Sequence, residues 1–144
     1  MTVQPPDPPA VDLDWDRIVA WRPRLTVADF EAGRWAGGEE HTPGVLTMPW
    51  VDYTDDVLDF IHQLYELQVV APFDWGAWVE KRGNELWEDP QRLAAVSLEE
   101  CRMLLTAHVR ADRFTEGHLL DAFNNGHIVA ILERVKSLIH EDQT

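Results

Sequence analysis

The sequence predicts a compact, mostly helical (all-α) single domain over residues 13–144, with about six or seven short-to-medium helices and room for one short strand near residues 45–51. The length of 144 residues, 45% of them hydrophobic and 26% charged, suits one domain with its own core. Apolar residues recur at helical spacing in the longest patterned segments, and capping residues precede several of them. No alternating stretch is long enough to predict a sheet.

The N-terminal quarter of the chain is predicted to be irregular with short helices. Residues 1–12 contain four prolines, whose fixed φ angles and missing N–H groups exclude both helix and sheet ladder, so a disordered Pro-rich arm is expected. Two short helices are predicted next, over about 14–21 and 27–35, separated by Pro23. Residues 39–53 carry two prolines and a glycine and would form an ordered loop.

A central helix is predicted over about residues 55–68, because apolar residues recur there at i, i+3 and i+4. These residues are Val57, Leu58, Ile61, Leu64 and Tyr65. Asp74 is the predicted N-cap of the next helix, and Phe73 and Trp78 have the spacing of a hydrophobic staple around it.

The second half of the chain carries clear helix-start signals. Asp89 would cap a short helix over about 90–96. Ser97 and Glu100 form a capping-box pattern at the start of a long helix, which should end near residue 112.

Two further helices complete the pattern. Thr115 can cap a short helix that ends near residue 123. The last helix, over about 127–140, has one apolar stripe of Ile128, Ile131, Leu132, Val135, Leu138 and Ile139.

The segment richest in chemistry runs from His108 to His118. One face of the long helix carries Leu98, Cys101, Leu105, His108 and Asp112. A histidine and an aspartate at i, i+4 can hydrogen-bond, so His108 and Asp112 are expected to pair. The following turns add Arg110, Arg113, Glu116 and His118.

Four interpretations of this segment remain open. The candidates for general acid/base catalysis are His108, Asp112, Glu116 and His118. A metal would use His108, Asp112 and His118, but their spacing matches no established motif, so no metal is predicted. Arg110 and Arg113 could clamp a carboxylate or a phosphate of a ligand or partner. A structural ion-pair network would use the same residues.

Seven tryptophans are many for this length: Trp15, Trp21, Trp35, Trp50, Trp75, Trp78 and Trp87. Short helices can rarely bury them all. One or two of them, from among Trp35, Trp50 and Trp87, are expected to remain partly exposed, where tryptophan often anchors a protein interface. Packing as half-buried core residues is the simpler explanation.

Other chemistry is largely excluded. There is no glycine-rich phosphate loop, no Walker lysine and no HExxH motif, so no cofactor is expected. Cys101 is the only cysteine, which excludes an intramolecular disulfide, and its place on the apolar stripe predicts a buried thiol.

The chain is strongly acidic, with 26 Asp and Glu against 12 Lys and Arg and a net charge of −14. Such a surface repels phosphate backbones, so direct nucleic-acid binding is not expected. The acidity favours a basic protein partner, or imitation of nucleic acid towards a nucleic-acid-binding protein; solubility is the simpler explanation. A signal peptide and an apolar run of about 20 residues are both missing, so a cytoplasmic protein without membrane contact is expected.

Three motifs also carry a family resemblance: PFDWGAW (72–78), LLTAHVRADRFTEGHL (104–119) and GHIVAILERV (126–135). With the preceding residues 48–67, they resemble an uncharacterised bacterial family, a domain of unknown function. The resemblance covers roughly residues 26–138. It implies a bacterial source and a small stand-alone domain, and it assigns no activity, cofactor or catalytic residue.

The sequence therefore predicts a small acidic helical interaction module that binds a protein partner, with an inhibitor or regulator that imitates nucleic acid as one form of it. The alternative is an enzyme, or a binder of a small anion or metal, centred on His108–His118. The oligomeric state is left open, and an enzyme is the less favoured reading.

Overall fold

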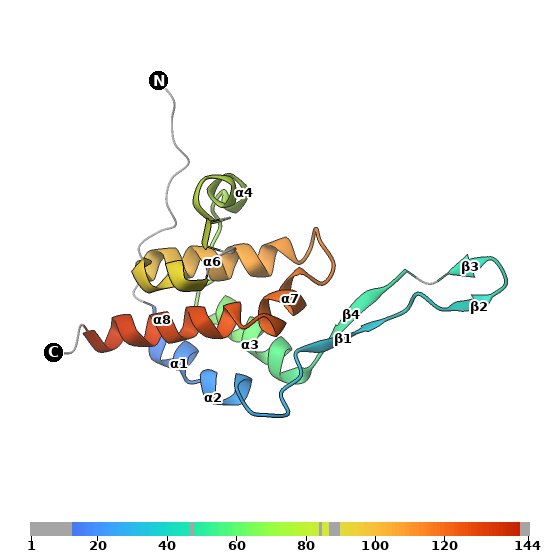
Figure 1. Cartoon of the computed structure of the whole chain (residues 1–144), viewed down its shortest axis with the longest axis horizontal. Coiled ribbons are helices and arrows are strands. Elements are labelled where there is room, and N and C mark those ends of the chain that lie inside the picture. Colours follow the sequence, from blue (N-terminus) through green and yellow to red (C-terminus); the bar gives the residue numbers. More distant parts are fainter. Residues whose placement is uncertain (1–12, 47, 84, 87–89, 142–144) are drawn as a thin grey trace, which may run out of the picture.

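The computed structural model of this chain describes residues 13–46, 48–83, 85–86 and 90–141. The expected Pro-rich arm at residues 1–12, together with Trp87 and Asp89, lies outside the described residues. Helices form the body of the molecule, and a long two-stranded ribbon projects from it (Figure 1). The fold is therefore mostly helical, as predicted, but it is not all-α.

The helical elements lie on both sides of the ribbon, which connects α2 to α3. The α-helices are α1 (Trp15–Val19), α2 (Arg22–Leu25), α3 (Asp55–Glu66), α4 (Trp75–Trp78), α6 (Leu98–Ala111), α7 (His118–Asn124) and α8 (His127–Glu141). A π-helical turn, η1 (Val79–Gly83), follows α4, and a 3₁₀ helix, η2 (Pro90–Ala95), precedes α6. Among the helices of the described segments, none combines the length and apolar character that crossing a membrane requires.

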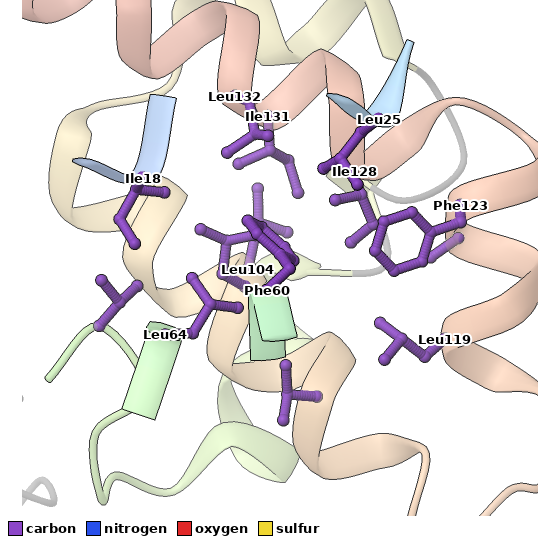
Figure 2. Close-up of a cluster of buried hydrophobic side chains, with 14 of the residues drawn as sticks. Ile18, Leu25, Phe60, Leu64, Leu104, Leu119, Phe123, Ile128, Ile131 and Leu132 are labelled. Carbon is purple, nitrogen blue, oxygen red and sulfur yellow. The ribbon is translucent and has the colours of Figure 1, made fainter. Parts of the chain in front are cut away.

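The core lies where α3, α6, α7 and α8 meet the short N-terminal helices (Figure 2). Its labelled members are Ile18, Leu25, Phe60, Leu64, Leu104, Leu119, Phe123, Ile128, Ile131 and Leu132. Phe60 stands edge-on to Trp21 at 5.8 Å and to Phe123 at 6.2 Å between ring centroids. Cys101 is also buried, which raises its thiol pKa to about 12 and leaves it unreactive.

The strongest local signals of the sequence are confirmed. Ser97 and Glu100 form the capping box at the start of α6, each side chain bonding to the other's backbone N–H. Asp74 caps α4 by accepting from the Ala77 N–H at 3.2 Å. Phe73 and Trp78 pack across that cap with ring centroids 6.3 Å apart, as a hydrophobic staple does.

The predicted stripe of α3 is partly wrong. Leu58 and Tyr65 are 50% and 38% exposed, whereas Val57, Phe60 and Leu64 are buried. The larger Phe60 side chain centres the buried face, and this rotates Leu58 into solvent.

The predicted helix over 27–35 is wrong, and so is the placing of Pro23 between two helices. Pro23 lies in the first turn of α2, where its missing N–H costs no hydrogen bond. Residues 33–36 form a strand, β1 (Gly33–Ala36). Its backbone pairs with residues far along the chain, which local helix signals cannot reveal.

The β-arm (residues 33–53) replaces the predicted ordered loop and its single strand near 45–51. Its strands are β1, β2 (Glu40–Thr42), β3 (Val45–Leu46) and β4 (Trp50–Tyr53). The pairs β1–β4 and β2–β3 are both antiparallel, and the second pair extends the first away from the body (Figure 1). Pro43 and Gly44, with φ +83° at the glycine, turn the chain at the tip.

The start of α7 also differs from the prediction. Thr115 does not cap this helix; Gly117 occupies the N-cap position with φ +90°. This left-handed conformation suits glycine and brings the loop before α7 against the base of the β-arm.

Candidate functional site

The segment from His108 to His118 separates into three places with different surroundings. The first is a chain of three imidazoles formed by His118, His108 and His127, which we call the imidazole chain. His108 Nδ1 lies 2.9 Å from His118 Nε2, and His108 Nε2 lies 2.7 Å from His127 Nδ1. His127 Nε2 in turn lies 3.2 Å from the carbonyl oxygen of Leu86.

The direction of the protons in this chain follows from its fixed end. The Leu86 carbonyl can only accept, so His127 must carry its proton on Nε2. A neutral His127 then accepts at Nδ1 from the Nε2–H of His108. By the same reasoning, His108 accepts at Nδ1 from the Nε2–H of His118. The geometry therefore fits three neutral rings that all carry their proton on Nε2.

Burial keeps these rings neutral. Burial lowers the pKa of His108 well below its usual value, and the charges of His127 and His118 would lower it further. Burial likewise lowers the pKa of His118, although Asp112 and Asp121 oppose this effect. The pKa of His127 is lowered by burial, against the hydrogen bond to Leu86.

One side of the imidazole chain faces a cavity of about 200 Å³ lined by His108, His118, Asp121, Ala122, Asn125 and His127. His108 uses its two ring nitrogens towards two different histidines, so the rings follow one another in series and do not converge on one point. Within the described segments, no group of three or more His, Cys, Asp or Glu side chains is placed to hold a metal ion. His118 could act as a base towards this cavity, with His108 and His127 fixing its orientation.

Asp112 and Glu116 belong to the second place, the base of the β-arm. The Tyr53 hydroxyl donates to Asp112 Oδ1 at 2.7 Å and accepts from the Leu120 N–H at 3.2 Å. Glu116 Oε1 accepts from the Val51 N–H at 2.7 Å. The expected pairing of His108 with Asp112 is thus replaced: Asp112 binds Tyr53 and the Leu119 N–H, and these bonds fasten the arm to the body.

The position of Tyr53 at the base of the arm changes the pKa of its hydroxyl. Burial raises the pKa of its hydroxyl, and the hydrogen bond to the Asp112 carboxylate raises it further. The hydroxyl therefore stays protonated and keeps donating to Asp112.

The base of the arm also depends on Gly117. A Cβ atom added there would lie 2.4 Å from Cζ2 of Trp35, and the φ of +90° is strained for any other residue. We expect Gly117→Ala to lower the free energy of unfolding by about 2–4 kcal/mol, from backbone strain plus displacement of the indole. Gly126→Ala is the matched control, because Gly126 has φ +81° and nothing within 4 Å. Denaturant unfolding of both variants isolates the Trp35 contact; equal losses would contradict it.

The third place holds Arg110 and Arg113. Both line an open groove of about 300 Å³ together with Pro72, Phe73, Trp75 and Phe114. The Arg110 guanidinium lies over the Tyr65 ring, 5.6 Å from its centroid. These two arginines therefore face a different region from the histidines.

The tryptophans proposed as interface anchors lie on the β-arm. Trp35 on β1 and Trp50 on β4 are 54% and 47% exposed, as expected. Trp87 lies outside the described residues.

Two residues that contact the predicted site residues were not predicted from the sequence: His127 and Tyr53. His127 precedes Ile128 and lies one helical turn before Ile131, so its position on the buried stripe of the last helix was a usable signal. Tyr53 carried no such signal, because its contact with Asp112 spans 59 residues.

Comparison with known proteins gives one result. A model of a family of unknown function, DUF6508, matches residues 10–141 of this chain. No curated protein and no solved structure matches it. The match spans nearly the whole chain and confirms the resemblance to a domain of unknown function. The chain therefore belongs to the family of unknown function DUF6508.

Proposed function

We propose that this protein is a protein-binding module whose contact surface is the β-arm. The observation that carries the proposal is the exposure of large apolar side chains along the projecting ribbon. They are Trp35, Val45, Leu46, Met48 and Trp50, with Leu46 and Met48 70% and 82% exposed. Contiguous exposed apolar side chains are typical of interaction sites, and a monomer gains no stability from displaying them.

The anchoring of the arm supports the same proposal. Glu116, Asp112 and Gly117 hold its base through Val51, Tyr53 and Trp35 respectively. A ribbon held in one direction loses less conformational freedom on binding than a free loop does, which favours affinity. The carboxylates found by sequence analysis then serve to present the arm.

Charge suggests the class of partner. The chain has a net charge of −14, and the arm itself carries Glu39, Glu40 and Asp52 against Arg34. A partner with an apolar groove bordered by Lys and Arg would complement it. Proteins that bind nucleic acid present such basic borders, so an inhibitor or regulator of one of them fits the proposal.

Site-specific photo-crosslinking in the native host tests this function. A benzophenone amino acid placed at Met48 should give an adduct with one partner that has a basic surface. In a lysate of the same cells, the yield should fall as salt is added. The same probe at Asp59, which is exposed on α3, is the control position. Adducts only with a second copy of this chain, or equal adducts from both positions, would contradict the proposal.

A matched pair of leucine substitutions gives a second test. Leu46 on the arm and Leu58 on α3 are both exposed, at 70% and 50%. Leu46→Ser should reduce capture of the crosslinked partner at least tenfold, whereas Leu58→Ser should leave it unchanged, with both variants folded by circular dichroism. The comparison separates loss of the arm surface from loss of any exposed leucine.

A further inference from the structure

We propose that the groove between the segment before α4 and the C-terminal end of α6, here called the arginine groove, binds a planar aromatic monocarboxylate. It is lined by Pro72, Phe73, Trp75, Arg110, Arg113 and Phe114 and has a volume of about 300 Å³. This is within the range of small-molecule sites, although at its lower end.

The aromatic wall of the groove is open to solvent. The Trp75 and Phe114 rings both line the groove, with centroids 6.0 Å apart and planes tilted by 36°. Phe114 is 79% exposed, although it sits in the turn that directly follows α6. An aromatic ring entering the groove could stack on one of these rings and meet the other at a tilt, both of which are geometries that aromatic pairs prefer.

The two arginines supply the charge. Among the described residues, neither Arg110 nor Arg113 has an ion-pair partner, although acidic residues outnumber basic ones by 26 to 12. Arg110 is held over the Tyr65 ring, which limits the directions of its guanidinium. A guanidinium fork binds a carboxylate through two parallel hydrogen bonds.

A structural role alone explains less of this geometry. Arginines at the end of α6 offset the partial negative charge of its last carbonyls. That effect needs neither the aromatic wall nor the cavity beside it. The combination of two cations, two aromatic rings and open volume indicates a ligand that has both a ring and a negative charge.

Electrostatics favour a carboxylate over a phosphate. The groove lies at the C-terminal end of α6, where carbonyl groups disfavour anions, and the whole chain has a charge of −14. Both penalties grow with the charge of the ligand. A single negative charge, balanced by two guanidiniums, is therefore preferred over the nearly double charge of a phosphate monoester.

Isothermal titration with 2-naphthoate as the probe tests the site. The neutral 2-naphthamide has the same ring and should bind at least tenfold more weakly. Arg113→Ala should weaken naphthoate binding at least tenfold, and Arg113→Lys should restore only part of it, because lysine has the charge without the fork. Lys136→Ala, on α8, is the control for loss of one positive charge and should bind as the wild type does.

Several results would overturn the inference. Equal binding of naphthoate and naphthamide would remove the role of charge, and unchanged binding by Arg113→Ala would place the probe elsewhere. Displacement of naphthoate by inorganic phosphate at equal concentration would assign the groove to phosphate. All of these outcomes are independent of the β-arm, so they leave the proposed function untouched.

Discussion

Lowering the pH from 7 to 5 should cost this protein up to about 2 kcal/mol of folding free energy through His108 alone. The folded-state pKa of His108 is lowered well below its value in the unfolded chain, first by burial and then by His127 and His118. The unfolded state therefore binds the proton first as the pH falls below about 6.5. Stability is highest above that pH and falls until the pH reaches the folded-state pKa. His118 and His127, shifted in the same direction, should steepen the fall.

Urea unfolding at a series of pH values measures this effect. His108→Leu should be less stable at pH 7, because the ring nitrogens of His118 and His127 lose their partner, but its stability should fall less steeply with pH. His62→Asn is the control, since His62 is exposed on α3 and its replacement removes an imidazole that does not belong to the imidazole chain.

Nitrogen chemical shifts test the same idea without any substitution. In the wild type at pH 7.5, all three rings should be neutral with the proton on Nε2, as the acceptor at Leu86 requires. A His108 that titrates near pH 6.5 in the folded protein would refute the argument. So would a His127 protonated on Nδ1.

Local signals account for the parts of the fold that the sequence predicted well. The capping box at Ser97 and the staple around Asp74 depend on residues three or four positions apart, so the chain segment contains the whole interaction. The stripe of α8 is similarly complete in its own sequence. These elements form where predicted because no distant partner decides them.

The β-arm was not predicted, because its strands depend on partners that lie outside each local segment. Its strands have two to four residues each, too short for an alternating pattern, and β1 pairs with residues 14 to 20 positions away. Pro43 and Gly44 were a hairpin signal, since proline followed by a glycine with positive φ makes a tight turn. Considered as loop residues, they could not reveal the ribbon on either side.

The candidate site shows the same division. His108, Asp112, Glu116 and His118 were predicted from the sequence, and each of them makes a specific hydrogen bond. Helical spacing paired His108 with Asp112, however, whereas Asp112 binds Tyr53 of β4. His108 instead binds His118 of α7 and His127 of α8. Helical spacing identifies which residues share a face, but the fold determines what packs against that face.

Replacing Arg102 is expected to have the second large effect on the free energy of unfolding. Its side chain is 2% exposed, and it donates from Nη2 to the Gln68 carbonyl at 2.9 Å and from Nε to the Val69 carbonyl at 3.2 Å. Gln68 has φ +62°, a left-handed conformation that is costly for a residue other than glycine. Arg102 thus holds the turn after α3 against α6, with Thr106 as a second donor to Val69 at 3.2 Å.

Arg102→Ala should lower the free energy of unfolding by about 3–5 kcal/mol, because it leaves a cavity and removes a hydrogen-bond donor from a buried carbonyl. Arg102→Met fills much of the volume without the donors, so the difference between the two variants measures packing alone. Arg92→Ala is the matched control: Arg92 is exposed and lies 3.5 Å from Glu85, and its loss should cost less than about 1 kcal/mol. The same turn leads into Ala71 and Pro72, so loosening it should also weaken naphthoate binding in the arginine groove. A loss from Arg102→Ala no larger than that from Arg92→Ala would show that the turn holds its conformation without the buried guanidinium.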